Sequence, residues 1–182
     1  TDLIALAIEH KADVGTLERL FALKERDDAA RARAAYFDAL ARFQASAPPV
    51  PKSREVKNRD GSVRYRYAPL DEVIRVLRPA LLEHGFSYRF GTARLESGCL
   101  SVTCIAHHVA GHSEQATVIV PQFAGQATNA AQDMGSANTY GRRYSFIDVF
   151  GCTSADEDND AASAGPANLD MLIRSCGTAR EW

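Results

Sequence analysis

The feature that most constrains the fold is a run of small residues between Ala127 and Gly141. At 3.6 residues per turn they share one narrow helical face, formed by Ala127, Ala130, Ala131, Met134, Ala137 and Gly141. So narrow a face lets a helix approach its neighbour closely, and we expect it to pack on a sheet. The opposite face carries Gln132, Ser136, Thr139 and Arg143, with Arg142 at its flank near Asn138. These polar side chains are suited to a contact outside the domain.

The preceding sequence supplies the sheet. Three strand-like runs, 86–95, 100–107 and 112–121, are separated only by short turns. Adjacent, closely spaced strands pair most simply as an antiparallel meander. We therefore predict an α+β fold with a β-β-β-α core, in which the meander is followed by a long helix from about 126 to 149.

The N-terminal part is expected to be helical. Apolar residues at helical spacing begin at Leu17, after a cap at Asp13 or Thr16, and predict one or two helices between 14 and 44. Their apolar face could dock on the same domain or on a neighbouring protomer. A further helix is predicted over 70–84, with Pro69 at its start and Gly85 at its end.

Length and composition favour one main domain, because 182 residues with 46% hydrophobic content can bury a core. We expect a helical region at 1–51, an α+β core at 52–151 and an acidic, partly flexible tail at 152–182. The apolar run at 3–8 is too short for a signal peptide, and no run has the length of a membrane span. The four cysteines lack CxxC spacing, which favours reduced thiols in a cytoplasm.

Net charge is only −2, but basic residues gather between positions 52 and 66. An Asn-Arg-Asp-Gly turn there predicts a hairpin that carries Lys52, Arg54, Lys57, Arg59, Arg64 and Arg66. Such a cluster neutralises phosphates without sequence preference, and tyrosines at 65 and 67 could stack on bases. The alternative is a solvated hairpin whose tyrosines pack into the core, because alternation places them opposite Arg64 and Arg66.

A second candidate lies on the long helix, where Arg142 and Arg143 stand between Tyr140 and Tyr144. Arginine forks match phosphate geometry and tolerate partial burial. The alternative is that they pair within the chain, with Asp133, Asp148 or the acidic run that follows.

Metal and nucleotide sites find little support. The acidic run 156–160 resembles the start of an EF-hand loop, but Ala161 and Ala167 replace the required Gly and Glu. Cys99 and Cys104 are five residues apart, so in a strand they face opposite sides, which argues against zinc. No phosphate-binding GxxxxGK[ST] loop and no GxSxG nucleophile elbow occurs. We therefore predict no cofactor, no metal site and no catalytic residue.

Three segments together resemble the ERF (essential recombination function) family of phage single-strand annealing proteins. They are YAPLDEV at 67–73, RPAL to HGF at 78–86, and the stretch 135–160 that contains GSANTYGRRYSFIDVFGC and the acidic run. The resemblance implies a β-β-β-α annealing core and a ring or helical homo-oligomer. It also implies ATP-independent binding and annealing of single-stranded DNA in homologous recombination.

The resemblance implies further expectations. DNA binding carries over to Tyr140, Arg142, Arg143 and Tyr144 within the matched motif, and we add Ser136 and Thr139 from the outward face. Expected partners are single-stranded DNA, further copies of the chain, and a host single-strand-binding protein or a phage exonuclease. The expected location is the cytoplasm of a bacterial host.

Two other functions stay open. One is a metal-dependent nuclease that uses Asp148, Asp156, Asp158 and Asp160. The other is a non-catalytic adaptor that binds proteins through its N-terminal helices. The acidic run is expected instead to be an exit segment that repels DNA from the wrong surface.

Overall fold

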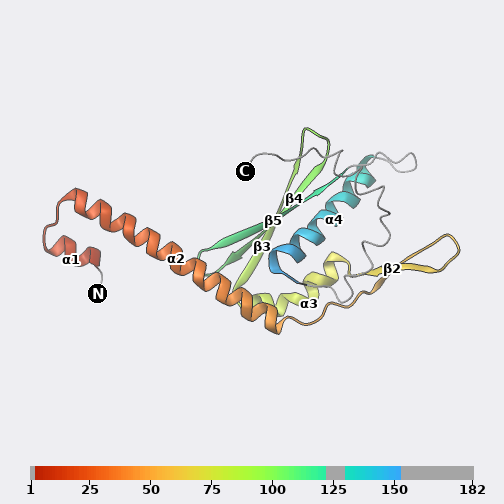
Figure 1. The fold of residues 1–182 in the computed structure, drawn as a ribbon, viewed down its shortest axis with the longest axis horizontal. Coiled ribbons are helices and arrows are strands. Elements are labelled where there is room, and N and C mark those ends of the chain that lie inside the picture. Colours follow the sequence, from red (N-terminus) through yellow and green to blue (C-terminus); the bar gives the residue numbers. More distant parts are fainter. Residues whose placement is uncertain (1–2, 122–129, 153–182) are drawn as a thin grey trace.

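The computed structural model of the chain describes residues 3–121 and 130–152. Its body is a three-stranded sheet with helices packed on one face (Figure 1). The strands β3 (Phe86–Arg94), β4 (Leu100–His108) and β5 (Ser113–Val120) are antiparallel in the order β3-β4-β5. The predicted α+β fold and its meander are confirmed.

Among the described residues, helices cover one face of the sheet only. In the central strand β4, alternate side chains are buried, namely Leu100, Val102, Cys104 and Ala106. The residues between them are partly exposed on the other face, where Thr103 and Thr117 are 2.8 Å apart. This alternation is what an antiparallel sheet with a single packed face requires.

The long helix α4 (Ala130–Phe150) lies over β4 and β5. Ala137 and Gly141 are buried against the sheet, and a Cβ atom at Gly141 would stand 2.6 Å from Cγ2 of Val102. The expected close packing of the small face is therefore confirmed at these two residues. Met134 differs, since it is 43% exposed. The close contact begins about one turn after it.

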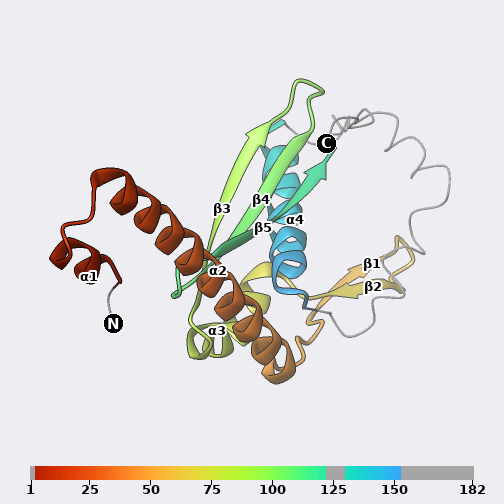
Figure 2. The ribbon, with the colours of Figure 1, turned by 60° about the vertical axis from the view of Figure 1, so that its left-hand side comes forward.

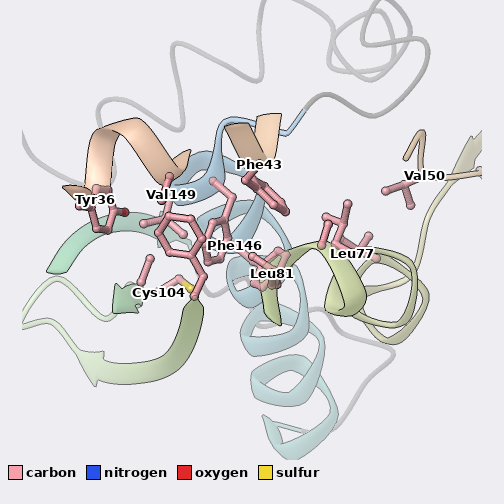
Figure 3. Close-up of a cluster of buried hydrophobic side chains, with 14 of the residues drawn as sticks. Tyr36, Phe43, Val50, Leu77, Leu81, Cys104, Phe146 and Val149 are labelled. Carbon is pink, nitrogen blue, oxygen red and sulfur yellow. The ribbon is translucent and has the colours of Figure 1, made fainter. Parts of the chain in front are cut away.

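Three helices and the sheet enclose the main core, drawn in Figure 3. Tyr36 and Phe43 come from α2 (Val14–Ser46), Leu77 and Leu81 from α3 (Leu70–Glu83), and Phe146 from α4. Aromatic rings join these elements, because Phe150 of α4 lies 5.6 Å from Phe43 and 5.7 Å from Phe86 of β3. The C-terminal part of α2 thus docks on its own domain, one of the two expected arrangements.

The rest of α2 extends away from the body (Figure 1). It is one continuous helix, capped by Asp13, whose carboxylate accepts hydrogen bonds from the backbone N–H and the hydroxyl of Thr16. A short helix, α1 (Leu3–Glu9), precedes it within the region 1–51 that we expected to be helical, although a separate helix there was not predicted. Local periodicity gave no sign of α1, whose seven residues are too few to show an amphipathic pattern.

The predicted hairpin is confirmed as β1 (Arg54–Lys57) paired with β2 (Val63–Tyr67), and it extends from the body on the side away from α1 (Figures 1 and 2). The turn has the expected chemistry, since Gly61 has φ +83° and Asp60 accepts a hydrogen bond from the Ser62 backbone. Hydrogen bonds from Ser62 hold the pKa of the Asp60 carboxyl below its ordinary value.

The acidic run at 156–160 and the rest of the expected tail after residue 152 lie outside the described residues. Within the described ranges, no helix is long and apolar enough to cross a membrane.

Candidate nucleic-acid interface

The two faces of the hairpin differ as alternation predicted. Arg64 and Arg66 are exposed, whereas Tyr65 and Tyr67 are half-buried on the opposite face. The register places Tyr65 across from Val56 and Tyr67 across from Arg54. The tyrosine face is therefore turned toward the body, and the two arginines of β2 face solvent.

The basic side chains of the hairpin are mostly exposed. One of them, Arg66, donates from both Nε and Nη2 to Oε1 of Glu55, at 2.9 and 2.6 Å. That pair is exposed and weak. Arg54, Lys57, Arg59 and Arg64 are exposed, and Lys52 is half-buried. The basic cluster predicted from sequence is thus assembled on one protruding element.

Arg143 lies among aromatic rings and forms no ion pair with the carboxylates of the described residues. Its guanidinium carbon lies 4.7 Å from the ring centroid of Tyr67, 4.7 Å from Tyr144 and 5.7 Å from Tyr140. Its Nη1 reaches the Ala68 carbonyl at 3.5 Å, and its Nη2 reaches the Tyr144 hydroxyl at 3.2 Å. Cation–π contact with three rings holds this arginine in place and ties the end of the hairpin to α4.

These contacts form one continuous row from hairpin to helix. Tyr65 lies 6.2 Å from Tyr67, Arg143 bridges Tyr67 to Tyr144, and Tyr144 lies 4.3 Å from Tyr140. We call these five side chains the tyrosine–arginine row. Tyr140 at its far end is 48% exposed. The row offers aromatic surface directly beside the basic hairpin.

The remaining predicted residues of α4 divide between two flanks. Ser136 and Thr139 are exposed, and the Thr139 hydroxyl donates to the Gly135 carbonyl at 2.9 Å. Arg142 turns away from Arg143 and lies over the ring of Phe90 on β3, 5.5 Å from its centroid. The structure therefore does not bring all twelve predicted residues to one surface.

Carboxylates and metal-binding side chains do not gather in the described part of the chain. It contains no group of three His, Cys, Asp or Glu side chains able to hold a metal ion. Asp148 is exposed on α4, and the other acids of the nuclease hypothesis, at 156, 158 and 160, lie outside the described residues. Cys104 is fully buried, and burial raises the pKa of its thiol to about 12.

Sequence reasoning missed the contact between Tyr67 and Arg143, which lie 76 positions apart. It also missed the hydrogen bond from Thr92 of β3 to Asn138 of α4, at 3.2 Å. The sequence did indicate that Asn138 and Arg142 lie close together, because they are four residues apart on one flank of the helix. It did not indicate that this flank contacts β3.

Comparison with known proteins gives one finding. A model of the ERF superfamily matches residues 37–170, which is most of the chain. No curated protein and no solved structure gives a significant match.

Proposed function

This chain belongs to the ERF superfamily, and from that premise we propose that it binds single-stranded DNA and anneals complementary strands without ATP. The superfamily implies phage recombination and strand annealing in general.

The observation that carries the proposal is the tyrosine–arginine row beside the basic hairpin. Every base has a flat π-face, so aromatic rings bind bases without regard to sequence, at about 1–3 kcal/mol per base. Nearby cations neutralise phosphates and give affinity that falls with salt. A protein that pairs arbitrary complementary strands needs both properties and needs no base-specific contacts.

In this proposal the basic residues have two different roles, phosphate binding and the positioning of aromatic rings. Arg54, Lys57, Arg59 and Arg64 on the exposed hairpin hold phosphates. Arg143 is enclosed by rings, so its role is to position Tyr67, Tyr140 and Tyr144 rather than to bind a phosphate. Tyr140 is 48% exposed, more than any other ring of the row, and is the first candidate for stacking on a base.

The mechanism is physical rather than covalent. One strand is held by its phosphates, a complementary strand pairs with its bases, and duplex formation supplies the free energy. Several protomers acting together would add avidity, since each binding event raises the effective concentration for the next. We therefore also propose a homo-oligomer, to be checked by light scattering with and without DNA.

The test is a fluorescence annealing assay with two complementary oligonucleotides, in EDTA and without ATP. We expect the protein to accelerate pairing and the effect to weaken as salt rises. Replacing Arg59 and Arg64 by Gln should slow pairing. Arg26→Gln, which removes an exposed charge from the distant part of α2, should not.

A protein that fails to bind single-stranded DNA at low salt would refute the proposal. Strand cleavage that depends on magnesium or manganese would instead support the nuclease hypothesis.

A further inference from the structure

The side chains of Arg142 and Arg143 lie on different flanks of α4, and the flank of Arg142 carries polar groups that do not contact the hairpin. Consecutive helical residues differ in direction by about 100°. Arg143 therefore reaches the hairpin while Arg142 reaches the edge strand β3, where its guanidinium lies over Phe90. The tyrosine–arginine row accounts for Arg143 only.

In the described part of the chain, Arg142 lacks the partners that a half-buried cation normally has. Its Nε is buried and has no hydrogen-bond acceptor among the described residues. None of the described carboxylates forms an ion pair with it either, although three other arginines on helices have such pairs. A half-buried guanidinium in this state is suited to an anion with several oxygen atoms.

A second polar group lies one turn earlier on the same flank. The Thr92 hydroxyl donates to Oδ1 of Asn138, which fixes the amide so that its two N–H hydrogens remain for another acceptor. The two contacts between β3 and α4 follow from the geometry of the two elements, because two residues of a strand and four residues of a helix each advance about 6–7 Å. Phe90 therefore lies beside Arg142, and Thr92, two residues along β3, lies beside Asn138, four residues along α4.

The same strand continues this surface. Thr92 and Arg94 are both exposed and point to the helix side of β3, as Phe90 does. They stay uncovered because α4 packs over β4 and β5 and leaves the second half of β3 beside it. We call Thr92, Arg94, Asn138 and Arg142 the β3 flank.

We propose that the β3 flank is a phosphodiester-binding site, separate from the hairpin, which receives the backbone of single-stranded nucleic acid. Arg142 and Asn138 donate to phosphate oxygens, Thr92 positions Asn138, and Arg94 adds charge at the far end. This inference rests on the proposed function and gives α4 two nucleic-acid surfaces, one along each flank.

The decisive variant is Asn138→Asp. It keeps the oxygen that accepts from Thr92, removes the two N–H donors, and places a carboxylate four residues before Arg142. Asp27–Arg31 and Asp38–Arg42 on α2 already pair at this spacing, at 2.8 and 2.6 Å. The new carboxylate should form an ion pair with Arg142 and leave the fold intact. An unfolding midpoint equal to that of the wild type checks that the fold is intact.

The matched control is Gln115→Glu, the same amide-to-acid change at an exposed residue of β5 on the uncovered face of the sheet. Binding of fluorescent oligo-dT is measured by anisotropy across a salt series. We expect Asn138→Asp to weaken binding about tenfold and to lower the slope of log affinity against log salt by about 0.7. The control should change neither.

The outcomes separate the two proposals. If Asn138→Asp binds like the wild type while Arg64→Gln binds weakly, the β3 flank is no site and the hairpin proposal stands. Equal losses for Asn138→Asp and Gln115→Glu also overturn the inference, because they would reflect overall charge. If the wild type binds no oligo-dT, both proposals fail.

Discussion

The contacts of Arg143 predict that one side chain holds the hairpin on the body. Three rings lie between 4.7 and 5.7 Å from its guanidinium. Each such contact contributes about 0.5–1 kcal/mol at an exposed site and more when desolvated. Arg143 is half-buried, so the three contacts together contribute roughly 2–3 kcal/mol to the stability of the fold. Of the three rings only Tyr67 belongs to the hairpin, so its contact alone joins the hairpin to α4.

The variant to make is Arg143→Met, which keeps an unbranched apolar stem among the rings. Sulfur–aromatic contacts restore about 0.3–1.5 kcal/mol, so we expect a net loss of roughly 1–2 kcal/mol in the free energy of unfolding. Urea denaturation followed by circular dichroism measures the total. Hydrogen exchange shows which part of the fold loses stability. The amides of β1 and β2 should exchange faster in Arg143→Met than in the wild type.

Arg142→Met is the matched control, because its guanidinium faces one ring, Phe90, at 5.5 Å. It should cost less than about 1 kcal/mol and leave exchange in the hairpin unchanged. The reasoning is wrong if Arg143→Met leaves hairpin exchange as in the wild type, or if both variants accelerate it equally. Either result would mean that the position of the hairpin is fixed by its chain connections and not by the contacts of Arg143.

Three further predictions concern stability. Gly141→Ala should destabilise the fold by about 1–3 kcal/mol, because its Cβ would lie 2.6 Å from Cγ2 of Val102. Gly135→Ala would meet nothing within 4 Å and should stabilise the fold by about 0.5–1 kcal/mol, and urea midpoints of the two variants check the difference. Tyr36→Phe should raise the free energy of unfolding by about 1 kcal/mol, since the buried hydroxyl has no partner among the described residues, and a lower urea midpoint would contradict this. Burial raises the pKa of Cys104 and that of Tyr36 to about 12 each, from 9.0 and 10.0, so the unfolded chain releases these protons first and stability should fall as pH rises from about 9 to about 12. Denaturation at several alkaline pH values checks this slope, which should be shallower above about pH 10 in Tyr36→Phe.

Much of the fold could be predicted because its signals are local. Short turns between strand-like runs indicate the meander, and the small residues at 137 and 141 indicate close packing on a sheet. Asp13 and Gly85 mark helix ends, and Gly85 has φ +74° just after α3. The side-chain parity of Tyr65 and Tyr67 follows from strand geometry alone.

The site was less predictable because its contacts join distant segments. Sequence spacing placed Tyr140, Arg143 and Tyr144 near one another, but it did not show that Tyr67 completes the enclosure. Charge alone suggested a phosphate ligand or an acidic partner for Arg143. Aromatic rings satisfy the same guanidinium without any charge, and nothing in the local pattern distinguishes these environments.

The glycine at position 141 has a consequence for sequence variation within the superfamily. It stands next to Arg142 and Arg143 at the closest approach of α4 to the sheet, where Val102 and Val120 would meet a Cβ atom at 2.6 and 3.2 Å. A larger residue there moves the helix outward and separates both arginines from their rings at once. Relatives with a side chain at this position should therefore carry smaller residues opposite it, and positions 102, 120 and 141 should covary although none touches DNA in this proposal.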